Sequence, residues 1–313
     1  MAITNGWGQA TQNNTNGFGK YQNTIDAGSV YADSYAGETS LVGTSASISY
    51  SASSFHQDES DPTPTITGTA GGTFSATPSG LSINTSTGTI DLDNSTIQSY
   101  TITYTVSGVS SSQSLAVTAS PFIANTFSMQ FDGVNDYIDV GNSIDLGLNS
   151  TVSMWLNLDS AYNGILLGED SYSFDYFLYP YSTGFFVRIA GTAINFSDVP
   201  TYLTAGSWHH LALVRSGDSI EVFVNGVSRG TNTGFGTATN TKFDTIAAKP
   251  NGTLPLGGKI DEFAAWNTAL SSDAVTEIYN ATNNNTGKAL DLSTDYNNYT
   301  SSLNLQYWNR LGD

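Results

Sequence analysis

The sequence predicts an all-β protein, with an extended N-terminal arm, a small β-sandwich and a larger two-sheet jelly roll that carries one short helix. From residue 62 onward, short segments in which apolar and polar residues alternate follow one another, and this period of two is typical of half-buried strands. Glycine, serine, threonine and asparagine, which favour turns or strands over helices, are abundant between them. Hydrophobic residues make up 39% of the chain, enough for more than one β core.

The charge balance excludes several classes of partner. Nine Lys and Arg against 27 Asp and Glu give a net charge of −18, which repels nucleic acids and anionic membranes. The excess serves either solubility or cation binding. The segment Met1–Gly8 lacks the basic and apolar regions of a signal peptide. The sequence also contains no apolar run of 18 residues, so we predict no membrane insertion. With no cysteine, disulfides and thiolate metal sites are excluded.

Residues 1–61 are predicted to be an arm and linker without a core of their own. They are rich in asparagine, glycine and threonine, sustain no hydrophobic period, and end in an acidic stretch before Pro62. Flexible linkers rarely carry many aromatic residues, whereas aromatic residues are common anchors at interfaces. We therefore favour an anchoring arm over a flexible tail. The predicted assembly anchors are Trp7, Phe18, Tyr21, Tyr31 and Tyr35.

Residues 62–120 are predicted to form the small sandwich. About six short strand signals fall in this range, and Tyr100–Val106 alternates most cleanly. The run Gly80–Ile90, followed by Tyr100–Thr103, resembles the Ig/cadherin-like repeats of bacterial and phage surface proteins. The resemblance implies an Ig-like spacer with no catalytic role.

Residues 121–285 are predicted to form the jelly roll, because about ten alternating segments are separated by turns such as Asn225-Gly226. One segment differs: Ser271 is a plausible N-cap, and Val275, Ile278 and Tyr279 share one face of the helix that would follow. Residues 286–313 begin polar and end in an alternating strand, Leu303–Trp308.

Five segments resemble, in order and spacing, the laminin-G-like branch of the concanavalin A-like superfamily. They are Phe131–Ile138, Ser153–Leu156, Gly206–Val214, Ile220–Gly226 and Gly258–Phe263, the last followed by Trp266 and the helix start at Ala269–Ser271. Members of this family usually open with a Tyr-Trp strand, which residues 100–125 lack, whereas this chain carries Tyr307-Trp308 near its end. Either a further domain starts there, or the last strand folds back into the vacant place. We favour the fold-back, because an unpaired sheet edge promotes aggregation.

Nothing in the sequence has the pattern of a catalytic site, so we predict no enzymatic activity and no catalytic residue. His209 and His210 are neighbours on one strand and face opposite ways. Some relatives in the superfamily cleave glycosides with two acids that share one strand face, but Glu169 and Asp170, like Asp261 and Glu262, are adjacent and cannot share one.

Calcium is the predicted cofactor, as a structural ion. Asp132, Asn135 and Asp136 sit in a glycine-containing turn that can supply oxygen ligands. The family resemblance implies that Asp261 lies close to this turn. The alternative is a turn capped by its own Asp and Asn side chains.

Four tyrosines in residues 171–182 are the predicted glycan-binding residues, since glycan binding is a common use of the family and sugars stack on exposed rings. They are Tyr172, Tyr176, Tyr179 and Tyr181. The alternative is that they only belong to a strand surface. The loop at residues 231–241 could add hydrogen bonds.

The N-terminal segments Ala2–Gly8, Asn16–Gly19 and Tyr31–Tyr35, with Ala289–Ser293, are similar to parts of virion structural proteins of marine tailed phages. We therefore predict a virion surface protein of the fibre or capsid-decoration type, on an extracellular particle. Its expected partners are other virion proteins through the arm, host glycans, and copies of itself, with a trimer favoured. The alternatives are a secreted bacterial lectin-like adhesin and, with less support, a concanavalin-fold glycoside hydrolase.

Overall fold

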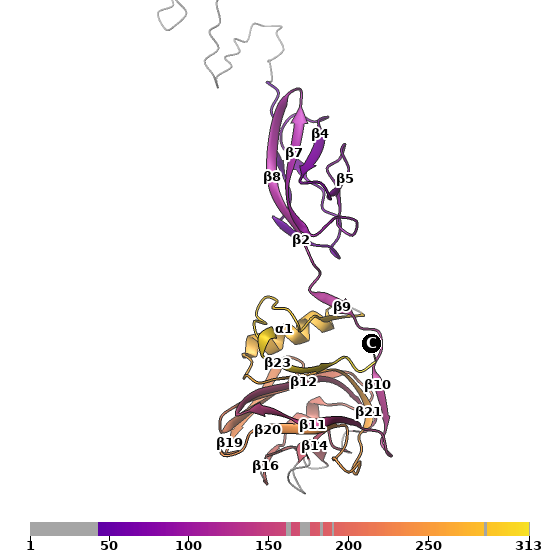
Figure 1. Cartoon of the computed structure of the whole chain (residues 1–313), viewed down its shortest axis with the longest axis vertical. Helices are drawn as coiled ribbons and strands as arrows, with labels where there is room; N and C mark the ends of the chain where they lie inside the picture. The colour runs from indigo at the N-terminus through magenta and orange to yellow at the C-terminus, as the bar shows by residue number, and fades with distance from the viewer. Residues whose placement is uncertain are drawn as a thin grey trace, which may run out of the picture. The chain divides into compact units, whose positions relative to one another are not determined.

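The computed structural model describes residues 43–160, 164–169, 176–181, 184–189, 191–284 and 287–312, with the backbone alone for residues 176–181. The described residues fall into two compact units, an N-terminal one that ends at residue 119 and a C-terminal one that begins at residue 120 (Figure 1). Strands dominate both, and α1 is the one α-helix of the described part, so the predicted all-β class is confirmed. No helix within the described ranges is long and apolar enough to span a membrane.

The N-terminal unit is built on the long hairpin of β7 and β8. Tyr100, Ile102 and Tyr104 alternate into its core, as the period of two predicts, and Ser107 and Gly108 turn the chain with positive φ, as in type I′ turns. β2, β8, β7 and β4 form one sheet, and β1–β3 and β5–β6 form two small ones. The strands are β1 Ile48–Ser49, β2 Ser54–His56, β3 Thr65–Ile66, β4 Thr73–Thr77, β5 Ser82–Ile83, β6 Ile90–Asp91, β7 Gln98–Val106 and β8 Val109–Thr118.

This unit begins earlier than the sequence analysis places it. β1 and β2 lie between residues 48 and 56, in the range expected to be linker, and Phe55 is buried in the core. Strands of two and three residues in a serine-rich segment are too short to show a period, so the pattern did not reveal them. The Ig-like character of the unit stays a prediction.

The C-terminal unit contains two large antiparallel sheets that pack face to face. The seven-stranded sheet has the order β10-β21-β12-β17-β18-β19, with β23 also paired to β21, and the six-stranded sheet has the order β11-β20-β13-β14-β15-β16. Their strands are β10 Met129–Asp132, β11 Ile138–Gly147, β12 Asn149–Leu158, β13 Leu167–Gly168, β14 Tyr176–Tyr181, β15 Gly184–Ile189, β16 Thr192–Phe196, β17 His209–Ser216, β18 Ser219–Val224, β19 Val227–Thr233, β20 Thr241–Ile246, β21 Gly257–Trp266 and β23 Leu305–Asn309.

The seven-stranded sheet is covered on both faces. Its inner face and the six-stranded sheet enclose the main core, to which Met154, Leu211 and Phe263 belong. Its outer face packs against α1 (Ser272–Asn283), β22 (Lys288–Leu290) and nearby residues, and Ala212, Phe223 and Trp266 belong to this second core. Figure 1 shows α1 and β12 in adjacent layers, with β11, β14 and β16 on the far side of β12. Two covered faces explain why most of β12 is buried.

Helix α1 begins where the sequence predicts. Ser271 caps it by accepting a hydrogen bond from the backbone nitrogen of Ala274 (3.1 Å), and the buried face includes Val275 and Ile278. The other short elements are β9 Phe122–Ala124, which pairs with β22, and the 3-10 turns Val199–Tyr202 and Ser302–Asn304.

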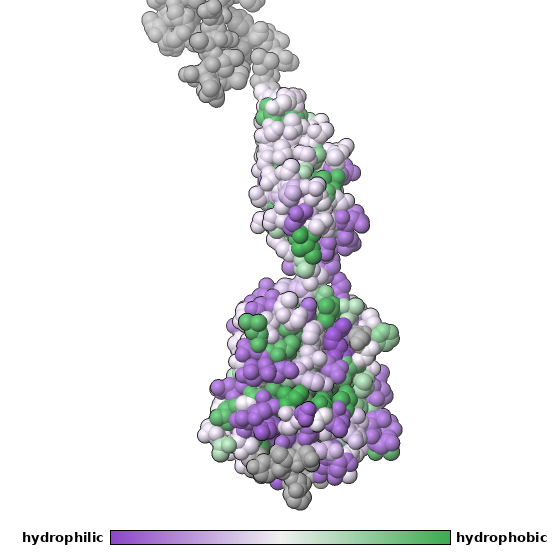
Figure 2. Space-filling view, in the orientation of Figure 1, coloured by the Kyte–Doolittle hydropathy of each residue, from purple (hydrophilic) through white to green (hydrophobic). Residues whose placement is uncertain are grey.

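β23 returns to the seven-stranded sheet. It pairs with Phe263–Trp266 of β21, whereas β10 pairs with Gly257–Ile260 of the same strand. The opposite edge of β21 is taken by β12, so β10 and β23 divide one edge between them. Apolar side chains reach the surface of this unit in patches between hydrophilic ones on the face seen in Figure 2.

Candidate functional site

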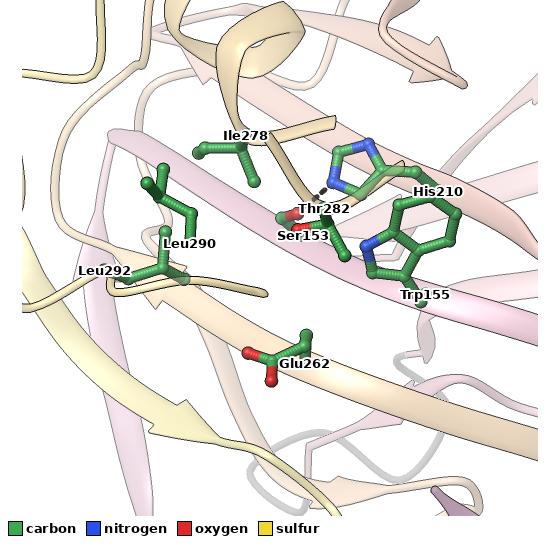
Figure 3. Close-up of a pocket in the computed structure, with 8 residues that line it drawn as sticks. All are labelled: Ser153, Trp155, His210, Glu262, Ile278, Thr282, Leu290 and Leu292. Atoms are coloured by element: carbon green, nitrogen blue, oxygen red, sulfur yellow. Dashed lines mark hydrogen bonds between the residues drawn. The ribbon is translucent and has the colours of Figure 1, made fainter. Parts of the chain in front are cut away.

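A small pocket lies on the outer face of the seven-stranded sheet, next to α1. The sheet contributes Ser153, Trp155, His210 and Glu262, and α1 and the segment after it contribute the other lining residues. The lining residues are Ser153, Trp155, His210, Glu262, Ile278, Thr282, Leu290 and Leu292 (Figure 3).

His210 and Ser153 form a hydrogen-bonded pair at the base of the pocket. His210 Nε2 lies 2.7 Å from Ser153 Oγ, and the imidazole is only 1% exposed. Burial lowers the pKa of His210 to about 3, so the ring is neutral at physiological pH. Its Nδ1 has no hydrogen-bond partner in the described part of the chain. A serine nucleophile needs a carboxylate on that nitrogen to orient the ring and stabilise its positive charge, and the pair lacks one.

Three aromatic rings fix the wall beside this pair. The ring of Trp155 lies 5.4 Å from the imidazole of His210 and 5.7 Å from the ring of Tyr279, which stacks on it at an interplanar angle of 25°. Tyr279 comes from α1, and His210 comes from β17, directly opposite Trp155. Helix and sheet therefore hold Trp155 in one orientation.

Glu262 reaches the pocket through a β-bulge. Ser153 pairs with Ala264 but Trp155 pairs with Asp261, so β21 has one extra residue here, and Glu262 adopts a positive φ of 47°. Its buried carboxylate accepts hydrogen bonds from Trp308 Nε1 (2.8 Å) and Arg310 Nε (3.1 Å). The returning strand and the residue after it thus balance the charge of this carboxylate.

The predicted glycan-binding tyrosines lie away from the pocket, on the other sheet. Tyr176, Tyr179 and Tyr181 fall in β14, and Tyr172 lies outside the described residues. Tyr179 pairs with Phe186, and Phe186 with Asn195 on β16. These pairs form a row across three strands, and within it Phe186 and Asn195 share a face of the sheet.

The four predicted calcium ligands do not form one site. Asp132 Oδ1 accepts a hydrogen bond from the backbone N–H of Val134 (2.8 Å), and Asp136 Oδ2 accepts one from the backbone N–H of Asp132 (3.0 Å). The turn is thus capped by its own side chains. Asp132 pairs with Gly257, so Asp261 is four residues along β21, roughly 13 Å away. Asn135 donates its backbone N–H to Asp132 (3.3 Å). Nowhere in the described ranges do three His, Asp or Glu side chains gather as a metal site. Calcium at the turn itself stays a prediction.

The anchors Trp7, Phe18, Tyr21, Tyr31 and Tyr35 lie outside the described residues. Sequence analysis did not predict the pocket. Ser153 and Trp155 entered it only as part of a strand signature, and Glu262 only as half of an adjacent acid pair. The one available signal was polar residues at the outward positions of an otherwise buried strand.

Residues 132–276 match the family model described as "Concanavalin A-like lectin/glucanases superfamily". No match to the chain was found among curated proteins.

Several solved structures resemble the chain at low identity, a likeness of fold. A structure described as "a putative carbohydrate binding protein from Bacteroides ovatus" is 14% identical with a TM-score of 0.50, and the match covers 84% of this chain and 88% of that one. A heptameric SAP-like pentraxin from Limulus polyphemus is 16% identical (TM-score 0.40; 49% and 81% covered). Domain 4 of an extracellular GH43 arabinanase from Geobacillus stearothermophilus, in complex with arabinotriose, is 17% identical (0.33; 65% and 86%).

Proposed function

We propose that residues 132–276, a domain of the concanavalin A-like lectin/glucanases superfamily, bind carbohydrate without cleaving it. The observation that carries the proposal is the two-sheet jelly roll over the range that the family model matches. The Bacteroides ovatus protein, which shares the fold over 84% of this chain, is described as carbohydrate binding, and this supports the proposal.

The chemistry of the pocket supports binding over cleavage. Glycosidases place two carboxyl groups about 5 to 10 Å apart on either side of the scissile bond. Glu262 is the one acidic residue among those that line the pocket, and its carboxylate is paired with Arg310. The neutral His210 has no carboxylate partner in the described ranges that would make it a catalytic base.

We place the main glycan contact on Phe186 and Asn195, with the predicted residue Tyr179 paired to Phe186 on the neighbouring strand. An aromatic face beside an amide suits a sugar, which presents C–H groups and hydroxyls on neighbouring sides. Asn195 lies over Gly184, since a Cβ at Gly184 would overlap the Asn195 amide. Gly184→Ala therefore displaces Asn195 without removing it.

Screening the full chain on a glycan array, with chromatography of each bound glycan after incubation, tests the proposal. We expect at least one glycan to bind and to be recovered intact. Asn195→Ala and Gly184→Ala should weaken binding at least fivefold, whereas Thr192→Ala, an exposed change on the same strand, should leave it unchanged. Absence of binding to any glycan overturns the proposed function, and shortened products overturn its non-enzymatic part.

We further propose that this domain is displayed on a virion surface, with residues 1–42 supplying the anchor to other virion proteins and the chain associating as a trimer. The aromatic residues Trp7, Phe18, Tyr21, Tyr31 and Tyr35 support an anchoring role, because aromatic side chains dominate interface energetics. Purified particles should contain the full chain and lose it when residues 1–42 are deleted. A chain secreted free of particles would favour the adhesin alternative.

A further inference from the structure

The pocket beside α1 contains polar groups that have no partner in the described part of the chain. The indole N–H of Trp155 and the hydroxyl of Thr282 both border the pocket, and neither makes a hydrogen bond with a described residue. Figure 3 shows the indole nitrogen of Trp155 on the side of the ring that faces Ser153. Both residues are half-buried, so these two groups can bond water or a ligand that enters the pocket in its place.

The Ser153–His210 pair adds a third group of this kind. If His210 Nε2 carries the proton, it donates to Ser153 Oγ, the serine O–H remains available, and Nδ1 is an unpaired acceptor. If Nδ1 carries the proton, the serine donates to Nε2 and a buried N–H is unpaired. Either tautomer leaves the pair incompletely satisfied, which is costly for a ring that is 1% exposed.

The wall opposite Trp155 is apolar and is formed by Ile278, Leu290 and Leu292. In Figure 3 these side chains lie on the other side of Ser153 from His210 and Trp155. The carboxylate of Glu262 borders the same space, with its charge balanced by Arg310. The pocket therefore combines hydrogen-bond donors, acceptors and hydrocarbon around a small volume. An exocyclic hydroxymethyl group matches it, because its carbon is apolar and its hydroxyl both donates and accepts.

We infer that this pocket binds the hydroxymethyl group of a neutral hexose, as a second carbohydrate site of the domain. The inference rests on the proposed function, but it places a ligand on the outer face of the seven-stranded sheet, whereas the row at Tyr179 belongs to the six-stranded sheet. The site extends beyond the range that matches the family model. Leu290 and Leu292 line it, and Trp308 and Arg310 hold Glu262.

The indole N–H signals in NMR spectra of the ¹⁵N-labelled full chain provide the test. The probes are methyl β-D-galactoside and methyl β-D-fucoside, which differ only in the hydroxymethyl group, at concentrations up to 0.2 M. The chain has five tryptophans, and Trp155→Phe identifies the signal of Trp155 by its loss. We expect the galactoside to shift this signal in a saturable way and the fucoside to shift it at least fivefold less.

Trp266 is an internal control, because its indole N–H already donates to Tyr299 Oη (3.0 Å), and its signal should therefore stay fixed. Thr282→Val, which keeps the shape and removes the hydroxyl, should weaken the galactoside response at least threefold. Trp208→Phe, at a 40% exposed residue that does not line the pocket, should not change it.

A Trp155 signal that does not move, or that moves equally with both sugars, overturns the inference. If the glycan array is positive in that case, the proposed function stands and only this second site fails. A selective Trp155 shift that Thr282→Val leaves unchanged would also overturn the pocket as the binding place.

Discussion

Arg310 and Glu262 form an ion pair that joins the end of the returning strand to the centre of β21. Nε lies 3.1 Å from Oε1, and the side chain of Glu262 is 6% exposed against 25% for Arg310. Arg310 also donates from Nη2 to the carbonyl of Ala124, which ends β9. One guanidinium thus connects three segments that are far apart in sequence, and its forked, planar shape suits this role.

Removing Arg310 should destabilise the C-terminal unit. Arg310→Met leaves the carboxylate of Glu262 buried without its cation, and we expect a loss of about 2–3 kcal/mol, less than for a fully buried pair because Arg310 is partly exposed. Urea unfolding followed by tryptophan fluorescence measures the change. Lys242→Met is the matched control. It breaks an exposed pair with Asp145 (3.3 Å) and should cost less than about 1 kcal/mol. Equal losses for both variants would contradict the role of burial.

The buried His210 should make stability depend on acid pH. Its folded pKa is about 3, below the unfolded value of 6.5, so the unfolded chain binds this proton more tightly. The contribution of neutral His210 to the free energy of unfolding is complete above pH 6.5 and is lost as the pH falls from there toward 3. By pH 4 this loss is on the order of 3 kcal/mol. Unfolding free energies at pH 7, 5 and 4 should fall less steeply for His210→Gln than for His209→Gln. Identical slopes for the two variants would show that His210 is not buried in its neutral form.

The hydroxyl of Tyr299 should contribute to stability beyond the packing of its buried ring. It donates to the carbonyl of Leu292 (2.8 Å) and accepts from Trp266 Nε1 (3.0 Å), and burial raises its pKa to about 12. Tyr299→Phe leaves a buried indole N–H and a carbonyl unpaired, which should cost about 2 kcal/mol. Thermal and urea unfolding measure this loss. Tyr202→Phe, at an exposed ring, is the control and should be neutral. No loss on Tyr299→Phe would mean that water replaces the hydroxyl.

Removing residues 305–313 should expose the edge of β21 and the second core. Leu305 and Trp308 pack against that core, and β23 alone covers Phe263–Trp266 on this edge. An unpaired apolar edge favours pairing between molecules. We expect the truncated chain to lose the cooperative unfolding of the C-terminal unit and to form large species in light scattering. A truncated chain that stays monodisperse and unfolds at the original denaturant concentration would contradict a structural role for β23.

The elements that sequence predicts well are those in which one face is buried. Tyr100, Ile102 and Tyr104 alternate because β7 has one apolar and one exposed face. β12 is different: α1 covers its outer face, so polar Ser153 and aromatic Trp155 are half or fully buried there. Their partners are His210 on β17 and Tyr279 on α1, and a pattern of period two carries no information on which distant segment lies above a strand. The pocket therefore could not be predicted.

Glu262 illustrates a second limit. On a regular strand, neighbouring side chains face opposite sides, so Glu262 and Asp261 could not act together as a catalytic pair. The bulge at this point adds a residue, and its positive φ is unusual for a glutamate, so nothing in the residue types indicates it. The returning strand was easier to predict, because Leu303–Trp308 alternates and the usual opening strand is missing.

The shared edge of β21 also fixes the order in which the C-terminal unit can be completed during synthesis. β10 can pair with Gly257–Ile260 as soon as β21 has left the ribosome, but Phe263–Trp266 must wait for residues 305–309. Until then the carboxylate of Glu262 has neither Trp308 nor Arg310, and part of the second core is open to water. The N-terminal unit makes all its strand pairs within residues 48–118, so it can be finished well before. A nascent chain stalled between these points would carry a finished N-terminal unit and a C-terminal unit with an unpaired strand edge.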